Sequence, residues 1–162
     1  MVNNTPISNQ QSGYTLIEIV MVIVILGVLT VVAAVRWPTG MGEDAAVLEF
    51  KRAVRYAQHT ALTRQYISSG KAWGITVSGN RYTVQRADGT PPAVVDYVNR
   101  SLPGDTSVGP NGTSVWFNGT GEPIDSGSGF PLGAQVTFNI GVSGRINVCP
   151  ETGYVMKGGS CP

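Results

Sequence analysis

The sequence contains little charge. Only 13% of its 162 residues are Asp, Glu, Lys or Arg, and the formal net charge is +1. Residues 36–162 carry eleven basic and nine acidic side chains, which is a net charge of +2. So small a charge provides no strong electrostatic surface for a polyanion. The composition therefore argues against nucleic acid as a partner.

Cysteine and histidine are also scarce. The only two cysteines, Cys149 and Cys161, lie close together, and the only histidine, His59, is distant from both. These three residues do not make a four-ligand zinc set, so we expect neither a metal site nor a cofactor. In an oxidising compartment the two cysteines predict a disulfide that stabilises by roughly 3 kcal/mol. Two unpaired core thiols are the alternative.

No catalytic pattern is present. The sequence has no Gly-x-Ser-x-Gly, no phosphate-binding loop and no His-Glu-x-x-His, and its ten acidic residues are scattered. A general base needs a positioned partner, and nothing near His59 in the sequence provides one. We interpret His59 as a surface or packing residue. A membrane-anchored enzyme stays the alternative, but it would need a site that no pattern indicates, so we expect a protein that is not an enzyme.

The sequence does contain one long apolar run. Residues 14–35 read YTLIEIVMVIVILGVLTVVAAV, in which Glu18 is the only charge. As a helix this run would be roughly 33 Å long, enough to cross the core of a bilayer. A helix buried in a soluble core would normally show a polar stripe, which is absent here. Residues 14–36 are therefore predicted to be a transmembrane helix.

A secretory signal peptide is the competing interpretation of this run, and the flanking residues argue against it. Such a peptide has a basic start, a shorter apolar stretch and a cleavage site after that stretch. Residues 1–13 contain no Lys or Arg, and Val35, Arg36 and Trp37 form a poor exit site. The small residue, Gly13, instead stands before the run.

The residues from Gly13 to Glu18 resemble the signature of bacterial type IV pilins and type II secretion pseudopilins: Gly, an aromatic residue, Thr-Leu-(Ile/Val)-Glu, then an unbroken apolar helix. The resemblance implies that residues 1–13 are a leader, that a prepilin peptidase cuts between Gly13 and Tyr14, and that Tyr14 is N-methylated. It also implies a single-pass protein of the inner membrane with its head in the periplasm. Its partners would be the assembly platform and other pilin or pseudopilin subunits.

Glu18 is predicted to make a contact between subunits during assembly. An ionised carboxylate within hydrocarbon costs about 2.5–3.5 kcal/mol on insertion scales. Cleavage would create an α-amine at Tyr14, and Glu18 of the same or a neighbouring subunit could pair with it and favour one axial register. The alternative is that Glu18 only snorkels to the headgroups.

Two features depart from the family pattern. The leader lacks the usual Lys or Arg, so the positive-inside rule does not orient the helix. The proline common about twenty-two residues into the mature chain is also missing, since Val35 stands there and Pro38 follows. We therefore expect the helix to break within residues 36–42, where Pro38 and two glycines interrupt it.

Helical periodicity returns in residues 37–66, predicted as the amphipathic half of the helix. Its apolar positions recur at helical spacing: Val47, Phe50, Val54, Ala57 and Ala61. The charges at Glu49, Lys51, Arg52 and Arg55 are interpreted as a solvated face, with a filament contact as the alternative.

The remaining residues, 67–162, are predicted to form a β-rich head. Short strands are expected at residues 72–78, 81–86, 94–98, 114–118, 135–140 and 145–149, with a further candidate at 153–156 and loops at 101–113 and 119–134. Gly79 and Asn80 fit a two-residue hairpin turn. The predicted fold class is α+β, with the helix laid on an antiparallel sheet, as in pilins.

Parts of the head refine the resemblance. Residues 115–123 and 144–148 resemble the H-type minor pseudopilin, and residues 149–155 resemble a minor pilin of the mannose-sensitive haemagglutinin pilus. We therefore expect a minor pilin or pseudopilin that joins or initiates a filament. A major pilin is one alternative. A DNA-binding minor pilin of natural transformation is another, for which the basic residues of the head would have to cluster: Lys71, Arg81, Arg86, Arg100, Arg145 and Lys157.

Overall fold

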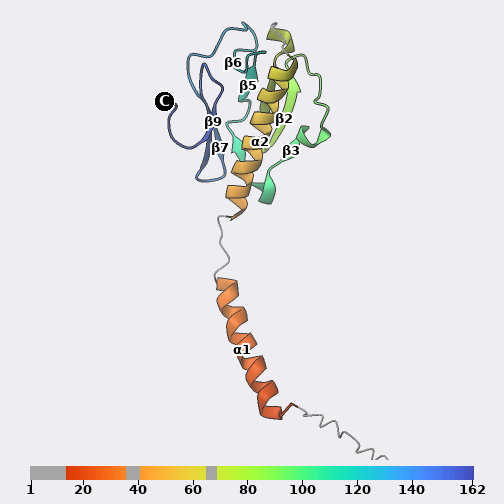
Figure 1. Cartoon of the computed structure of the whole chain (residues 1–162), viewed down its shortest axis with the longest axis vertical. Coiled ribbons are helices and arrows are strands. Elements are labelled where there is room, and N and C mark those ends of the chain that lie inside the picture. The colour runs from red at the N-terminus through yellow and green to blue at the C-terminus, as the bar shows by residue number, and fades with distance from the viewer. Residues whose placement is uncertain (1–13, 36–40, 65–68) are drawn as a thin grey trace, which may run out of the picture. The chain divides into compact units, whose positions relative to one another are not determined.

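The computed structural model describes residues 14–35, 41–64 and 69–162, and Figure 1 shows the chain with both α-helices and several of its strands labelled. The chain divides into two compact units, Met1–Thr39 and Gly40–Pro162. The described part of the first unit contains one helix, α1 (Leu16–Val35). The described part of the second contains helix α2 (Met41–Arg64), two β-sheets and three short 3-10 helices, η1 (Ser69–Lys71), η2 (Val95–Tyr97) and η3 (Pro103–Asp105).

Helix α1 contains no proline, and away from its two ends its backbone N–H and C=O groups pair with one another within the helix. Internal pairing is what a segment with almost no polar side chains needs, because nothing else in it can satisfy the backbone. Thr30, one of its few polar residues, donates its hydroxyl to the carbonyl oxygen of Gly27 at 2.8 Å. The hydroxyl is thus paired within the helix as well.

Helix α2 buries the predicted stripe. Val47, Phe50, Val54, Ala57 and Ala61 are all at most 3% exposed, which confirms the periodicity read from the sequence. The helix begins at Met41, so the prediction that the break extends to residue 42 is wrong at its last two positions. The other residues of that break, 36–40, lie outside the described residues, as do positions 65 and 66 of the predicted helix.

The first sheet has five strands in the order β3-β2-β1-β5-β6, and all neighbours are antiparallel. Its central pair is β1 (Trp73–Ser78) and β2 (Arg81–Arg86), joined through Gly79 and Asn80 as predicted. Gly79 has a φ of 61°, the left-handed conformation that a tight turn of this kind requires. The outer strands are β3 (Arg100–Ser101), β5 (Ser114–Phe117) and β6 (Pro123–Ile124).

A second antiparallel sheet has the order β4-β7-β8-β9. Its strands are β4 (Val108–Gly109), β7 (Val136–Ile140), β8 (Gly144–Val148) and β9 (Val155–Lys157). The expectation of a single sheet is therefore corrected to two sheets. The fold class is nonetheless α+β, with a helix packed on antiparallel sheets, as predicted.

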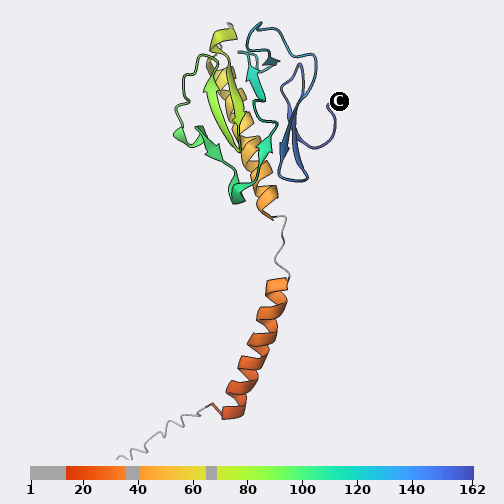
Figure 2. The same cartoon turned by 180° about the vertical axis from the view of Figure 1, so that it is seen from behind.

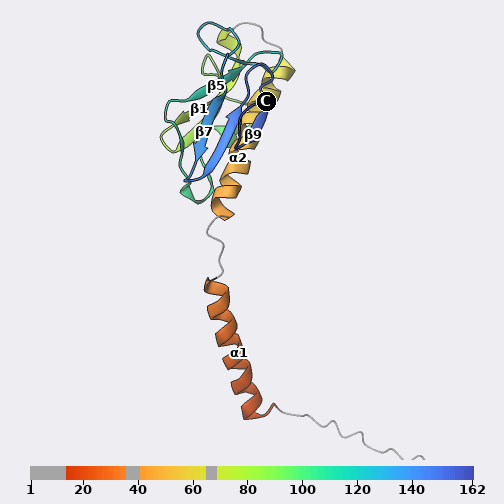
Figure 3. The ribbon, with the colours of Figure 1, turned by 90° about the vertical axis from the view of Figure 1, so that its left-hand side faces the viewer.

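Helix α2 packs against both sheets and closes the core between them. In Figure 1 it lies in front of the strands, with β2 and β3 to its right and β7 and β9 to its left; Figure 2 shows the strands from behind and Figure 3 from the side. The ring of Phe50 contacts Tyr82 of the first sheet at a centroid distance of 5.4 Å and Phe138 of the second at 5.0 Å. One helical side chain thus joins the two sheets.

The strand predicted at residues 94–98 is wrong. Residues Val95–Tyr97 form η2, and Val95 is 78% exposed. The ring of Tyr97 stacks on Tyr56 of α2 at 4.7 Å, and this contact, rather than a strand partner, holds the segment. The predicted loops also contain short strands: β4 lies within 101–113, β6 lies within 119–134, and β3 takes in residue 101.

Candidate functional site

The residues that resemble the pilin signature lie at the start of α1. Tyr14 and Thr15 precede the helix, and the carbonyl oxygen of Thr15 accepts bonds from the N–H groups of Glu18 at 3.0 Å and Ile19 at 3.3 Å. Glu18 therefore lies in the first helical turn, where the helix dipole favours an acidic side chain. Gly13, the predicted residue before the cleavage point, lies outside the described residues.

Tyr14 and Glu18 lie on the same side of this turn. Together they line a shallow depression, whose other walls are Ile19, Val22 and Ile23. A spacing of four residues places two positions one turn apart on a helix. The structure thus brings together the residue whose amine cleavage would free and the carboxylate predicted to pair with it.

Around this site, α1 exposes apolar side chains on every side. All described side chains from Tyr14 to Thr30 are exposed, and many are large. A continuous apolar surface of this kind marks a site of interaction with membrane or protein. Counting only described residues, the structure holds no helix with both the length and the hydropathy to cross a membrane. The transmembrane segment predicted at 14–36 reaches residue 36, outside the described residues, and stays a prediction.

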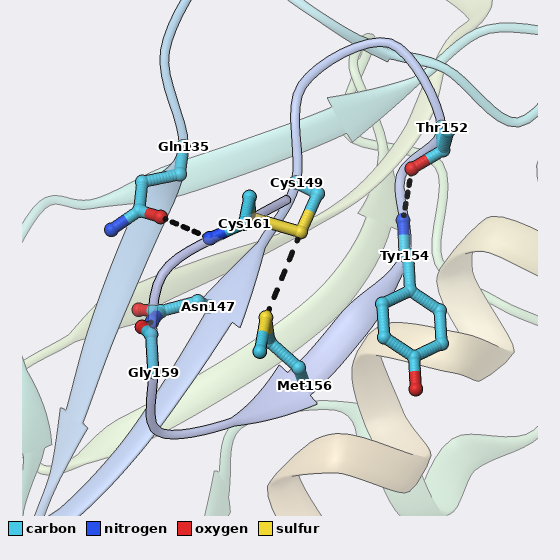
Figure 4. The surroundings of a disulfide bond; sticks show 8 residues. All are labelled: Gln135, Asn147, Cys149, Thr152, Tyr154, Met156, Gly159 and Cys161. Carbon is cyan, nitrogen blue, oxygen red and sulfur yellow. Dashed lines mark hydrogen bonds between the residues drawn. A yellow bond between two sulfur atoms is a disulfide. The ribbon is translucent and has the colours of Figure 1, made fainter.

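The second predicted site is the disulfide at the end of the head. Cys149 and Cys161 are bonded, with their Cα atoms 5.5 Å apart, which confirms the predicted bridge (Figure 4). Cys149 directly follows β8 and is 3% exposed. The sulfur of Met156, on β9, lies 3.8 Å from the sulfur of Cys149. The bridge therefore ties residue 161, beyond β9, to the end of β8.

Hydrogen bonds hold the segment between the two cysteines from several sides. Gln135 accepts a bond from the N–H of Cys161 at 3.2 Å, and the buried side chain of Asn147 donates to the carbonyl oxygen of Gly159. From α2, the side-chain amide of Gln58 donates to Gly121 at 2.9 Å and to Thr152 at 3.3 Å. The bridged segment is thus fastened to the residue before β7, to β8 and to α2.

The charged face predicted on α2 is only partly solvated. Glu49 forms an ion pair with Arg100 at 2.7 Å and accepts a bond from the hydroxyl of Tyr82 at 3.3 Å. The interpretation of Glu49 as solvated is therefore wrong, because a head residue distant in sequence reaches it. Arg52 and Arg55 are exposed, Lys51 is half-buried, and His59 is exposed.

Sequence reasoning missed a contact between α2 and the second sheet. Glu43 accepts bonds from the N–H of Ser143 at 2.7 Å and from its hydroxyl at 2.8 Å, and also from the N–H of Gly144. These bonds, the main-chain bond from Ser143 first, lower the pKa of Glu43 below its ordinary value. Only a Glu in the first turn of α2 and a Ser-Gly turn were visible in the sequence, one hundred residues apart.

Within the described residues, no group of three or more His, Cys, Asp or Glu side chains lies close enough to hold a metal ion. The bonded state of Cys149 and Cys161 removes both thiols as ligands. Among the described residues, two features still need a functional explanation. They are the exposed apolar helix α1 and the disulfide-bridged loop of the head.

Residues 8–34 match the family model described as the prokaryotic N-terminal methylation motif. The match covers the predicted cleavage point, Tyr14, Glu18 and most of α1, and it supports assignment to the type IV pilin and pseudopilin family. No curated protein and no solved structure gives a significant match to the chain.

Proposed function

We propose that the protein is a structural subunit of a type IV pilus or a type II secretion pseudopilus, held in the inner membrane by α1 before it is assembled. The single observation that carries the proposal is the surface of α1, which is apolar on all sides and interrupted by Glu18 one turn from Tyr14. A helix of this kind is stable in lipid or among other apolar helices. Partners on this proposal are a prepilin peptidase, the assembly platform and other subunits.

We further propose a minor subunit of the H-type branch, with the mannose-sensitive haemagglutinin pilus as one system in which it would serve. Support comes from the resemblance of residues 115–123, 144–148 and 149–155 to such proteins. In the structure these segments form the hairpin of β5 and β6, strand β8 and the bridged loop. We also infer a role without catalysis, in which the head serves recognition and packing.

A DNA-binding head is less well supported, because several of its candidate cations are already engaged. Arg86 pairs with Asp88, Arg100 with Glu49, and Lys157 with Asp44. Arg81 donates to the carbonyl oxygen of Asn99 at 2.6 Å. Cations held by carboxylates have little left to offer phosphates, since affinity for nucleic acid depends on neutralising them.

The proposal is tested by Glu18→Ala, with Glu18→Gln as the matched control. Alanine leaves Gly13 untouched and makes the helix more apolar, so processing and membrane insertion should be unchanged. Recruitment into filaments should fall several tens-fold or more, because a partly dry charge pair is worth on the order of 2–5 kcal/mol. Glutamine keeps a hydrogen-bonding group without the charge and should give an intermediate loss.

The measurement compares processed protein in the membrane with processed protein in sheared filaments. If Glu18→Ala enters filaments as well as the wild type does, Glu18 is a snorkelling residue and the proposed pairing with the Tyr14 amine is wrong. If the wild-type chain never reaches a filament, the proposed function itself fails.

A further inference from the structure

The turn between β7 and β8 carries an apolar side chain that the fold does not use. The turn consists of Gly141, Val142 and Ser143, and Val142 is 100% exposed. Turn positions usually hold glycine or a small polar residue, and β-branched residues fit strands better. A valine that packs on nothing adds no stability to the head. Val142 is therefore placed where an apolar partner from outside the head can reach it.

Two contacts hold this turn in place. On one side, Glu43 accepts a bond from the N–H of Ser143 at 2.7 Å and another from its hydroxyl at 2.8 Å. On the other side, the N–H of Gly141 donates to the carbonyl oxygen of Ser107 at 2.8 Å. Glu43 lies in the first turn of α2, and Figure 1 and Figure 3 show the β7–β8 turn beside this part of the helix. Val142 is thus held on a fixed support where α2 begins.

The start of α2 is also the part of the head that is nearest in the chain to the apolar helix. Helix α1 ends at Val35 and α2 begins at Met41, so only residues 36–40 connect them. Five residues of chain reach at most about 20 Å. On the proposed function, a bilayer that holds α1 up to Val35 therefore has its surface within this reach of the start of α2.

We propose that the β7–β8 turn is a lipid-contacting turn, in which Val142 enters the boundary between the headgroups and the acyl chains of the membrane that holds α1. The proposal rests on the proposed function, because it requires α1 in the bilayer. It goes beyond that function because it gives the head its own contact with lipid before assembly. Two points of contact, α1 and the turn, restrict how the head is oriented on the membrane.

A lipid surface suits a single exposed valine better than a separate protein does. A stable interface between proteins buries about 800 Å² on each partner, far more than one valine provides. A contact made by a chain that is already anchored can be much smaller, because the anchor supplies a high effective concentration. The membrane that holds α1 is the partner to which this condition applies.

The charged side chains next to the turn are compatible with a lipid contact. Both carboxylates in the first turn of α2 are engaged, since Glu43 accepts bonds from the turn and Asp44 pairs with Lys157 at 2.6 Å. Arg145, three residues after Val142, is exposed, and a cation at this place suits lipid phosphate. Apolar side chains beside basic ones are typical of segments that lie in a membrane interface.

The experiment uses the full chain, isotope-labelled at its valine methyl groups, in nanodiscs of phosphatidylcholine that include a lipid with a nitroxide on its headgroup. Methyl signals close to the nitroxide lose intensity in the NMR spectrum. The signals of Val142 should be lost, whereas those of Val95, a valine that is 78% exposed but lies in η2, should be kept. Phosphatidylcholine has no net charge, so a loss in these nanodiscs reports an apolar contact rather than attraction between opposite charges.

Val142→Asp tests whether the valine itself makes the contact. The reporter is Val47 of α2, which lies next to the turn, because a Cβ on Gly144 would stand 2.7 Å from one of its methyl carbons. Val47 should lose part of its intensity in the unmodified chain and recover it in Val142→Asp, since a charged side chain is costly among acyl chains. Val95→Asp, the same change at another exposed valine, should leave the Val47 signal as it is in the unmodified chain.

Val142 signals that keep their intensity would overturn the proposal, as would a Val47 signal that does not respond to Val142→Asp. Equal losses at Val142 and Val95 would also overturn it, because the contact would then not be specific to the turn. A chain that does not enter the nanodiscs at all would overturn the proposed function instead.

Discussion

Among single residues, Glu43 connects the first turn of α2 to the turn between β7 and β8. Its carboxylate accepts bonds from Ser143 and Gly144, and these lower its pKa from the ordinary 4.5. A carboxylate with a depressed pKa in the folded state stabilises the fold fully above its unfolded pKa. That contribution is lost as the pH falls below about 4.5 and through the folded pKa.

We predict that Glu43→Gln lowers the stability of the detergent-solubilised full chain at neutral pH. The difference in the free energy of unfolding between variant and wild type should become smaller as the pH falls below 4.5, because the wild-type carboxylate then becomes protonated and loses its charge. Denaturant unfolding of both proteins across the pH range measures the gap. Asp44→Asn is the control and should have a small effect, since exposed ion pairs contribute little. A gap that is constant with pH would contradict the assigned role of Glu43.

Gly153 is a second residue that joins distant segments. Its φ of 65° lies in the left-handed region, and a Cβ at this position would stand 2.5 Å from the amide nitrogen of Gln58 and closer still to the carbonyl oxygen of Gly121. The lack of a side chain therefore lets the bridged loop, α2 and the turn before β6 meet.

Gly153→Ala should destabilise the fold by about 1–2 kcal/mol for the backbone conformation and a further ~1–3 kcal/mol for overpacking. Gly158→Ala is the matched control, because Gly158 has nearly the same φ, 62°, and a Cβ added there would have no atom within 4 Å. Its cost should be the backbone part alone. Equal losses for the two variants, measured by denaturant unfolding, would show that the close approach at Gly153 does not matter.

At the scale of elements, the patterns that repeat could be predicted from the sequence. The buried stripe of α2 and the hairpin of β1 and β2 follow from helical spacing, strand alternation and a Gly-Asn turn. The pair Tyr14 and Glu18 follows from a spacing of four residues. Each of these depends on neighbours in the sequence, where local patterns carry the information.

Elements that depend on distant partners could not be predicted. Strands β3, β4 and β6 have two residues each and exist only because a longer strand pairs with them. The Val-rich segment at 94–98 was predicted as a strand, but its residues 95–97 form the 3-10 helix η2, in which Tyr97 stacks on Tyr56. The ion pair of Glu49 with Arg100 likewise joins residues far apart in the sequence. The prediction from sequence therefore placed Glu49 on a solvated face.

The disulfide gives a prediction for the second sheet. Reduction of Cys149–Cys161 should lower the free energy of unfolding by roughly 2–3 kcal/mol, since a short closed loop restricts the unfolded chain. Comparing wild-type protein with and without reductant avoids the cavity that Cys149→Ala would leave in a buried position. The Cys149→Ala, Cys161→Ala double variant should lose at least as much and should not respond to reductant. No difference between the oxidised and reduced protein would mean that the bridge adds no stability.

At the scale of the whole molecule, we propose that the two units have different roles. The helix of the first unit has an apolar surface on every side, and the second unit has its own core between α2 and two sheets. Most carboxylates of the second unit are engaged within that unit, in ion pairs or as hydrogen-bond acceptors. Such a division suits a subunit that is held by one part and recognised by the other.

The most direct test of this account is the mass of the N-terminal peptide of the protein extracted from the membrane of its native cells. Processing between Gly13 and Tyr14 predicts a mature chain that begins at Tyr14 and carries one methyl group on its amine. Protein from cells that lack the prepilin peptidase should keep residues 1–13. A mature chain that begins near Trp37, or an intact Met1 in cells with an active peptidase, would contradict the assignment as a pilin-type subunit.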